Sequence, residues 1–303
     1  MNNELISVMM STYNETAKEL AQSVDSILNQ TYQNIEFIIV NDNPANIELD
    51  GYLKNIKDSR VILVKNEVNL GLVKSLNKAL SFAKGEYVAR MDADDISMPD
   101  RLEKEISHLK TNCLDIVGTD IQLIDDNDVV IKERMRFPAT DTLARKYINY
   151  GNCMAHPTWL VKKEVYEKLG GYRDVKSCED YDFLIRLLFS TNFKVGNISQ
   201  IGLKYRIRNS GVSKSSEARQ FVLRSFIAKN KEHIKDISQE RIDEYLASNV
   251  FKKEVSLYEK YKADKEKAKQ DRNIDSVFHV LTNKYFYIIQ IEKYYLKKRD
   301  KDK

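Results

Sequence analysis

Three aspartates within four residues are the part of this sequence best suited to chemistry. Asp92, Asp94 and Asp95 come directly after the apolar residues 87–89, which have the pattern of a strand. On an extended backbone Asp92 and Asp94 project to the same face, where their carboxylates repel each other. A divalent cation, Mn²⁺ or Mg²⁺, removes that repulsion and leaves room for substrate phosphates. The alternative is a solvated acidic turn, since aspartate is common in turns.

Two other polar clusters stand at comparable places in the chain. Residues 11–15 follow the first apolar run, and residues 41–43 follow the second. If these runs are parallel strands, all three clusters lie at the carboxyl edge of one sheet, which is where open α/β sheets bind their ligands. Three polar clusters at one edge predict a binding site more strongly than any one of them alone.

The elements that must position these clusters alternate between strand and helix patterns. Strands are predicted from the apolar runs at 5–10, 35–40, 61–64 and 87–89. The second run is nearly continuous, as expected of a strand buried on both faces. Apolar residues at helical spacing predict helices over 20–28 and 72–83, and Gly85 is expected to close the second helix. The β-α-β-α order predicts an α/β fold with a mostly parallel central sheet flanked by helices.

The residues after the aspartates are expected to be structural. Ser97 and Asp100 have the spacing of a capping box and Pro99 suits the first turn of a helix, so Asp100 is predicted to be a helix cap. An EF-hand register that starts at Asp92 puts Ser97 at the position that needs glycine and Pro99 inside the loop. That register is therefore rejected.

Length and composition are those of an ordinary soluble protein, with 303 residues of which 42% are hydrophobic and 31% charged. The net charge of +4 is too small to indicate nucleic-acid binding. Three cysteines that are far apart in the sequence fit a reducing cytosol. Because neither a signal peptide nor a long apolar run is present, we expect a cytoplasmic protein that is soluble or peripheral on the inner face of the cytoplasmic membrane.

A series of short motifs, taken in order, resembles the family 2 glycosyltransferases. The motifs are residues 6–15, 38–42, 69–71, 85–95, 99–102, 170–172, 179–180 and 205–206. The resemblance implies a GT-A fold, which is a Rossmann-like sheet that holds a nucleotide-sugar, in a domain of residues 1–214 followed by an α-helical C-terminal extension of residues 215–303. It also implies transfer with inversion at the anomeric carbon, of the bacterial cell-surface polysaccharide type.

The resemblance places the nucleotide at the strand ends. The residues it implies are Thr12, Tyr13, Asn14, Glu15, Asp42, Asn69, Gly71, Lys74, Asp92, Ala93 and Asp94. A carboxylate at Asp42 can accept from the ring N–H of a pyrimidine, which suits a UDP-sugar. Asn14 is equally suited to a helix N-cap, and Lys74 to a solvated place on a helix, so both alternatives stay open.

Metal binding and catalysis are implied for two sets of carboxylates. Asp94, Asp95 and Asp92 are the candidate ligands of Mn²⁺ or Mg²⁺, which would offset charge on the leaving diphosphate. Asp94 is the first choice, with Asp95 in competition and Asp92 facing the ribose as the other option. Asp180 is the expected general base for the acceptor hydroxyl, with Glu179 the weaker candidate. Simple charge complementarity at a helix N-terminus is the alternative for this pair.

The chain departs from the family pattern in the predicted flexible loop 205–213. Many relatives have a histidine metal ligand where Arg208 stands, and a guanidinium cannot take that place. Arg206 or Arg208 is then expected to contact the diphosphate directly. His156 and Trp159 fall where relatives shape the acceptor site, although a place in the core is the alternative for both.

The tail from residue 251 onward is aromatic and basic. It has 15 lysines and arginines against 9 aspartates and glutamates, which gives it a formal charge of +6. Such a segment suits an amphipathic helix at an anionic membrane surface, near a lipid-linked acceptor. Alternatively, the same residues pack onto the core or mediate self-association.

These observations predict an inverting, metal-dependent glycosyltransferase that moves a sugar from a UDP-sugar to a hydroxyl of a glycan or a lipid-linked glycan. A nucleotidyltransferase is the alternative enzyme, but it would need a glycine-rich basic loop where residues 11–15 stand. A catalytically idle nucleotide-sugar-binding module is the other alternative, and the presence of both Asp180 and the aspartate cluster argues against it.

Overall fold

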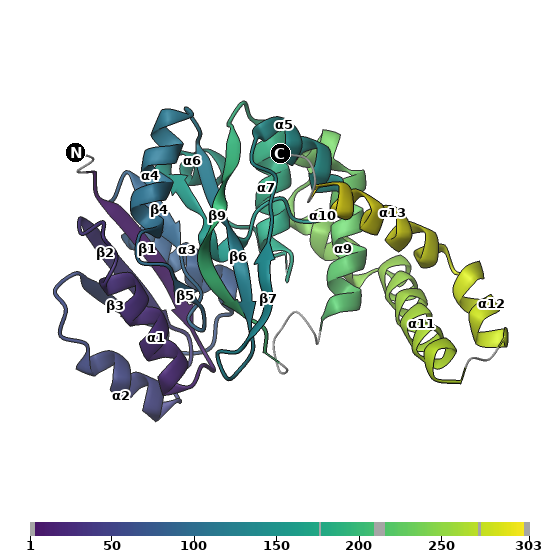
Figure 1. The fold of residues 1–303 in the computed structure, drawn as a ribbon, viewed down its shortest axis with the longest axis horizontal. Helices are drawn as coiled ribbons and strands as arrows, with labels where there is room; N and C mark the ends of the chain where they lie inside the picture. The colour runs from purple at the N-terminus through teal and green to yellow at the C-terminus, as the bar shows by residue number, and fades with distance from the viewer. Residues whose placement is uncertain (1–3, 176, 209–215, 272–273, 300–303) are drawn as a thin grey trace.

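The computed structural model describes residues 4–175, 177–208, 216–271 and 274–299, and Figure 1 shows their arrangement. In this part of the chain nine strands form one sheet in the order β3-β2-β1-β4-β8-β6-β9-β5, with β7 paired to β6. The strands are β1 (Ile6–Thr12), β2 (Ile35–Asn41), β3 (Val61–Lys65), β4 (Tyr87–Arg90), β5 (Ile96–Ser97), β6 (Ile116–Ile124), β7 (Val130–Met135), β8 (Leu160–Lys162) and β9 (Val195–Arg206).

The first four strands are parallel neighbours, as the alternating pattern predicted. β2 is buried at every position, which confirms the prediction of a strand covered on both faces. Beyond β4 the sheet is mixed, because β8 is antiparallel to β4 and β6, β7 to β6, and β5 to β9, while β6 and β9 are parallel. The α/β class is confirmed, with the parallel order concentrated in the first half of the sheet.

Helices connect the strands and cover the sheet. They are α1 (Ala17–Leu28), α2 (Ile47–Asn55), α3 (Leu72–Phe82), α4 (Arg101–Thr111), α5 (Asp141–Tyr147), α6 (Lys163–Leu169) and α7 (Glu179–Ser190), with short 3-10 turns η1 (Ile148–Tyr150) and η2 (His156–Thr158). Helix α2 was not predicted from the sequence, because its buried face consists only of Leu49 and Leu53. Two apolar positions are too few to produce a helical stripe.

The predicted role of Gly85 as a helix terminator is wrong. α3 ends at Phe82, and the backbone of Gly85 instead lies directly against β1. A Cβ at this position would be 2.5 Å from Leu5 O and 2.8 Å from Ser7 Oγ, so only glycine fits. The residue is therefore needed for close packing of the chain before β4.

The predicted capping box at the start of α4 is also wrong. Ser97 lies in β5, and the helix begins at Arg101 with Asp100 in the N-cap position. The Asp100 side chain makes no cap hydrogen bond and pairs with Lys104 at 2.6 Å instead. Asp100 is thus structural, as expected, but as a surface ion pair.

The described residues after 215 form the predicted helical extension. Its elements are α9 (Glu217–Lys229), η3 (Lys231–Asp236), α10 (Gln239–Ala247), α11 (Asn249–Asp271), α12 (Ile274–Thr282) and α13 (Lys284–Arg299). In Figure 1, α11 and α12 extend away from the sheet, and α13 runs back toward α5. Over the described ranges, no helix combines the length and the apolar character needed to cross a membrane.

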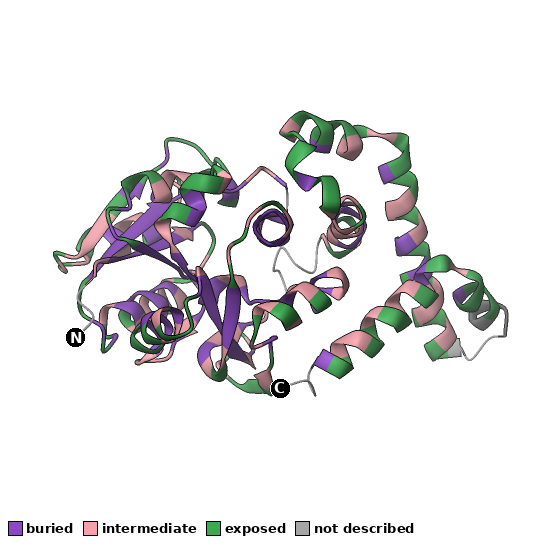
Figure 2. Cartoon of the chain, turned by 90° about the horizontal axis from the view of Figure 1, so that it is seen from above, coloured by how far each residue is buried: buried purple, intermediate pink, exposed green. Residues whose placement is uncertain are grey.

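Apolar side chains pack on both faces of the sheet, where Figure 2 shows the buried residues in purple. Alternate residues of β2 divide between the two faces: Phe37 belongs to one cluster of buried side chains and Ile38 to the other. The cluster with Ile38 continues into the extension, where it includes Tyr258 of α11 and Tyr285 of α13. The C-terminal helices are therefore packed on the same core as the sheet.

Candidate active site

The carboxyl ends of β1, β2 and β4 meet at one edge of the sheet, as those of parallel neighbours must. Thr12 ends β1, Asn41 ends β2, and the aspartate turn, residues 92–95, follows β4. Arg206, the last residue of β9, reaches the same turn because its backbone N–H donates to Asp95 Oδ1 at 2.8 Å. The structure thus brings the three predicted polar clusters to one edge.

The carboxylates of the aspartate turn have different surroundings. Asp92 and Asp94 are partly exposed, whereas Asp95 is 1% exposed. Asp92 Oδ1 lies 2.5 Å from Arg90 Nη2, and Asp94 Oδ2 lies 3.0 Å from Arg208 Nε. Asp95 Oδ2 is buried without a hydrogen-bond partner among the described residues. Because residues 92–95 form a turn, the same-face spacing expected of an extended backbone does not apply.

Burial and mutual repulsion oppose full ionisation of this turn. Burial, followed by the charge of Asp92, raises the pKa of Asp94 to about 7. Burial, followed by the charges of Asp94 and Asp92, raises the pKa of Asp95 well above its usual range. A bound cation would relieve this repulsion.

The two arginines after β9 have separate roles. The Arg206 side chain is 1% exposed and donates to Asp94 O at 2.8 Å, Asp125 O at 2.9 Å and Asp128 Oδ1 at 2.6 Å. The predicted contact of Arg206 with a diphosphate is therefore wrong, since its guanidinium braces the loops. Arg208 remains at the site, where it pairs with Asp94 and with Glu19 Oε2 at 2.6 Å. The rest of the predicted flexible loop, residues 209–213, lies outside the described residues.

The loop after β1 is ordered by its own glutamate. Glu15 Oε2 accepts from Thr12 Oγ1 at 2.6 Å and from the backbone N–H of Tyr13 at 2.7 Å. The side chain of Tyr13 is 40% exposed, which leaves its ring open to a ligand. Asn14 is not the helix cap, because Thr16 and Glu19 form the capping box of α1. Asn14 Oδ1 instead accepts from Asn43 Nδ2 at 3.2 Å, which joins the first two polar clusters.

Asp42 is buried and organises the segment 66–71. Its Oδ1 accepts from Asn66 Nδ2 at 2.7 Å and from Leu70 N at 2.8 Å, and its Oδ2 accepts from Gly71 N at 2.9 Å. Gly71 has a φ of +83°, which favours glycine, and Asn69 Oδ1 also accepts from its N–H at 2.9 Å. The carboxylate predicted to bind a base is thus already engaged in positioning the loop that begins α3.

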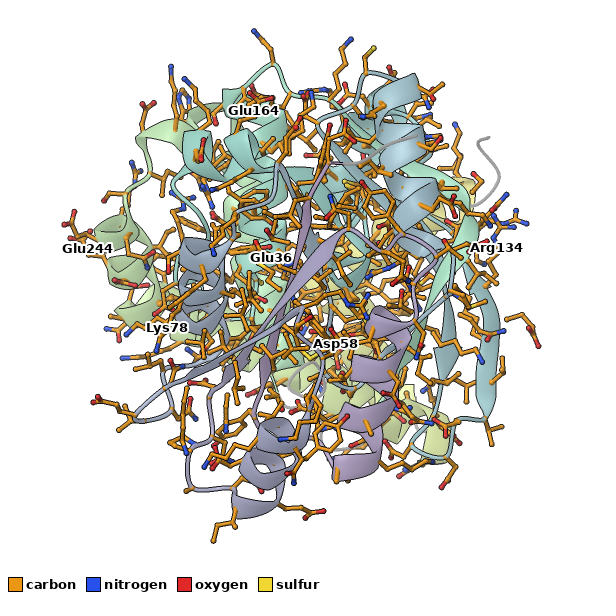
Figure 3. All side chains as sticks on the ribbon, turned by 90° about the vertical axis from the view of Figure 1, so that its left-hand side faces the viewer. Glu36, Asp58, Lys78, Arg134, Glu164 and Glu244 are labelled. Atoms are coloured by element: carbon orange, nitrogen blue, oxygen red, sulfur yellow. The ribbon has the colours of Figure 1, made fainter. Side chains whose placement is uncertain are left out.

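Lys74 lies exposed on the first turn of α3. The lysine that interacts with this loop is Lys78, one turn later and labelled in Figure 3, whose Nζ donates to Asn66 Oδ1 at 2.7 Å. The solvated alternative for Lys74 agrees with its exposure. Ala93 is buried within the aspartate turn, so its side chain packs inward.

Glu179 and Asp180 are the first two residues of α7. Asp180 Oδ2 accepts from Asn152 Nδ2 at 2.5 Å, and Asp180 Oδ1 accepts from the backbone N–H of Tyr181 at 2.7 Å. Burial raises the pKa of Asp180, and the charge of Asp92 adds to that rise. Glu179 is buried, and burial followed by the charge of Asp180 raises its pKa to about 8. The partly exposed Asp180 is therefore the better placed of the two to meet a substrate.

The predicted acceptor contact of Trp159 is wrong, because its side chain is 0% exposed and belongs to the core. His156 packs edge-on against Trp159, with ring centroids 4.6 Å apart, and its Nε2 lies 2.9 Å from Tyr172 Oη. Burial and the charge of Arg90 lower the pKa of His156 well below its usual range, so the imidazole is neutral. Trp159 thus lies in the core, which was the alternative stated for it, and the partly exposed His156 packs against it.

Two residues at the site were missed from the sequence. Glu19 belongs to a capping box, yet its carboxylate also pairs with Arg208. Asn152 sits between two short 3-10 turns and holds Asp180. The Thr16–Glu19 spacing offered a signal for the first, whereas a lone asparagine 28 residues before its partner offered none.

Comparisons with known proteins define the class. Residues 7–170 match the model of Glycosyl transferase family 2. The O-antigen biosynthesis glycosyltransferase WbnJ of Escherichia coli is 38% identical over 233 residues, which cover 75% of this chain and 90% of that protein. The chain belongs to glycosyltransferase family 2 and is a glycosyltransferase, which confirms the predicted family and rules against a nucleotidyltransferase.

Two further proteins are similar to this chain. UDP-Glc:alpha-D-GlcNAc-diphosphoundecaprenol beta-1,3-glucosyltransferase WfgD of Escherichia coli is 28% identical over 217 residues, covering 70% of this chain and 81% of that protein. The crystal structure of S. aureus TarS 1-349 in complex with UDP-GlcNAc is similar with a TM-score of 0.61 at 20% identity, and covers 80% of this chain and 70% of that one. The predicted GT-A fold is confirmed.

Proposed function

We propose that this enzyme transfers a sugar, with inversion, from a UDP-sugar to a hydroxyl of a glycan or lipid-linked glycan in surface polysaccharide synthesis. The observation that carries the proposal is that a second acidic residue, Asp180 at the start of α7, lies close enough to the aspartate turn for the charge of Asp92 to contribute to its raised pKa. A carboxylate opposite a diphosphate site is the arrangement that an in-line displacement at the anomeric carbon requires.

A UDP-sugar is the donor that the surroundings of β1 and β2 favour. The exposed Tyr13 ring can stack on a base, and the polar groups of Thr12, Asn14 and Glu15 stand beside it. The neighbouring fold with bound UDP-GlcNAc and the UDP-Glc in the name of WfgD support the same nucleotide. Asp42, Asn69 and Gly71 contribute by shaping the loop at the base side rather than through free side chains.

Mn²⁺ or Mg²⁺ is the cofactor in this proposal, and the aspartate turn fits such a cation. Asp95 Oδ2 is a buried oxygen without a hydrogen-bond partner among the described residues, and an all-oxygen donor set suits a hard divalent ion. No set of three or more His, Cys, Asp or Glu residues in the described ranges is arranged to hold a metal by itself. Asp94, Asp95 and Asp92 would therefore share the ion with the diphosphate, whose departing charge it neutralises when bound.

The chain's own groups act on either side of the sugar. Arg208 is 15% exposed beside Asp94, where its guanidinium can contact the diphosphate directly. Asp180 takes the proton of the acceptor hydroxyl as its oxygen attacks the anomeric carbon, and the bond to the diphosphate breaks on the opposite face. Glu179, which burial keeps protonated near neutral pH, is a supporting residue in this scheme.

We further propose that the enzyme works at the cytoplasmic face of a membrane, through α13. Tyr287, Ile291 and Tyr294, here called the α13 stripe, are 58%, 52% and 62% exposed at i, i+4 and i+7. Lysines of the same helix are exposed around it, and the single acidic residue of α13, Glu292, is paired with Arg224. An apolar and basic face of this kind is complementary to anionic lipid. Self-association through the same stripe is the competing outcome.

The proposed organisation is a glycosyltransferase domain of residues 1–214 and a helical extension of residues 215–303. The boundary itself falls in residues 209–215, outside the described residues. The shared core of the two parts supports treating the extension as integral to the enzyme.

A donor screen tests the proposal. We expect UDP release from a UDP-sugar in the presence of Mn²⁺ or Mg²⁺, no release after chelation with EDTA, and little release from GDP- or dTDP-sugars. The anomeric configuration of the product, followed by NMR, should be opposite to that of the donor. Release from none of the UDP-sugars would contradict the enzymatic proposal and favour an idle binding module.

A further inference from the structure

We propose that Asn152 is a positioning residue for Asp180, and that α13 keeps Asn152 in place by clamping the segment that carries it. The inference rests on the proposed function of Asp180 as the general base. It gives the C-terminal helix a part in catalysis, although α13 begins 104 residues after Asp180 in the sequence.

Both oxygens of Asp180 are held by protein donors. Oδ1 accepts from the backbone N–H of Tyr181 at 2.7 Å, and Oδ2 accepts from Asn152 Nδ2 at 2.5 Å. The first donor is fixed by the start of α7, so the second decides how the carboxylate is rotated. A general base must meet its proton within hydrogen-bonding distance, so this rotation matters for turnover.

Asn152 lies on a segment with little regular structure of its own. Residues 148–150 form the single turn η1, and Gly151 follows in extended conformation. Tyr181 Oη donates to Ile148 O at 2.8 Å, which connects the segment to α7. Helices α9 and α13 of the C-terminal extension also contact it.

Tyr295 and Arg299 of α13 both contact this segment. Tyr295 stacks on Tyr150 with ring centroids 3.9 Å apart and an interplanar angle of 7°. Arg299 Nη1 lies 3.4 Å from the carbonyl oxygen of Asn152, and its guanidinium carbon lies 5.4 Å from the ring centroid of Phe137. The helix therefore contacts the residues on either side of Gly151.

Arg224 of α9 connects α13 to the same segment. Its Nη2 donates to both carboxylate oxygens of Glu292 at 2.8 Å, and its Nη1 lies 3.4 Å from Tyr150 O. The packing around Gly151 is close, because a Cβ there would lie 3.4 Å from Arg224 Nη1 and 3.5 Å from Leu296 Cδ2. Loosening α13 should thus free Asn152 without touching the nucleotide side of the site.

The test compares two tyrosines with the same kind of stack. Tyr295→Ala removes the stack on Tyr150, and Tyr245→Ala removes the stack of Tyr245 on Phe226, where the centroids are 3.8 Å apart and the interplanar angle is 11°. We expect Tyr295→Ala to lower kcat for UDP release roughly tenfold, the size of one lost charged hydrogen bond, with KM for the UDP-sugar within about twofold. Tyr295→Phe keeps an aromatic ring at this position and should have the wild-type kcat. Tyr245→Ala should also leave kcat unchanged.

Two measurements separate positioning from general destabilisation. Asn152→Ala should also lower kcat about tenfold, and adding Tyr295→Ala to it should cause no further loss, since both act through one hydrogen bond. Hydrogen exchange of peptide 148–153 should become faster in Tyr295→Ala and stay unchanged in Tyr245→Ala.

Additive losses in the double variant, or an equal loss of kcat in Tyr245→Ala, would overturn the inference. If Asp180→Asn is inactive while Asn152→Ala turns over like the wild type, only the positioning role fails. If Asp180→Asn keeps full turnover, the proposed function of Asp180 fails instead. If hydrogen exchange of peptide 148–153 is unchanged in Tyr295→Ala, the proposal that α13 holds this segment in place is wrong, whatever the effect on activity.

Discussion

Replacing Asp42 by alanine should destabilise the fold and loosen residues 66–71. Asp42 is 2% exposed, and its carboxylate accepts from Asn66, Leu70 and Gly71. The alternative, implied by the resemblance to relatives, is that Asp42 mainly recognises the base of the nucleotide. The two roles predict different losses, so one variant can distinguish them.

The expected magnitude follows from what each donor retains. Asn66 Nδ2 still has Ser75 Oγ at 2.9 Å, and Gly71 N still has Asn69 Oδ1 at 2.9 Å. Leu70 N loses its acceptor, but because Leu70 is exposed, water can replace part of the lost hydrogen bond. The variant loses three hydrogen bonds to a carboxylate, but the remaining acceptors and water compensate for part of the loss. The net decrease in unfolding free energy should be about 2–3 kcal/mol. For a chain of this size that corresponds to a fall in Tm of roughly 4 °C.

Urea unfolding and UDP titration calorimetry measure the two effects on the same variants. Asp100→Ala is the matched control, because Asp100 forms an exposed i,i+4 pair with Lys104 and should cost about 0.5 kcal/mol or less. If Asp42→Ala is as stable as Asp100→Ala, the bracing role is wrong. Loss of UDP affinity without loss of stability would instead support direct recognition of the base.

Two further predictions concern parts of the molecule away from the catalytic carboxylates. Burial raises the pKa of Glu105 from 4.5 to about 8. Between these two pH values the folded protein keeps a proton on Glu105 that the unfolded chain loses. The free energy of unfolding should therefore fall as the pH rises from about 4.5 to about 8. Glu105→Gln should reduce this fall, which urea unfolding at pH 4.5 and pH 8 would detect; an unchanged slope would contradict the assignment. Serine replacement of the α13 stripe should abolish flotation of the full-length protein with phosphatidylglycerol vesicles, whereas replacement of exposed residues 129–131 should not. Loss of a dimer with unchanged flotation would assign the stripe to self-association.

Much of the sheet was predictable because its signals are local. Apolar runs identified β1 to β4, and the polar residues after them marked the edge where the site lies. Helix α2 escaped because its buried face has only two leucines. Gly85 was assigned to the wrong function, since its close approach to β1 depends on a contact 78 residues away.

The details of the site depended on contacts that are distant in sequence. Nothing local distinguishes Arg206 from Arg208, yet the first is buried under the loops and the second faces Asp94. Trp159 could not be separated from an acceptor-site aromatic until its burial was known. Asn152 gave no pattern at all, because its importance comes from one hydrogen bond to α7.

The turnover of Asp180→Asn tests most directly whether Asp180 is the general base of the transfer reaction. The asparagine keeps the shape of the side chain and removes the base, so UDP release from the donor preferred by the wild type should fall by about a hundredfold or more. UDP affinity should stay within about twofold, because Asp180 lies on α7 and not among the residues at the ends of β1 and β2. Undiminished turnover in Asp180→Asn would contradict the account.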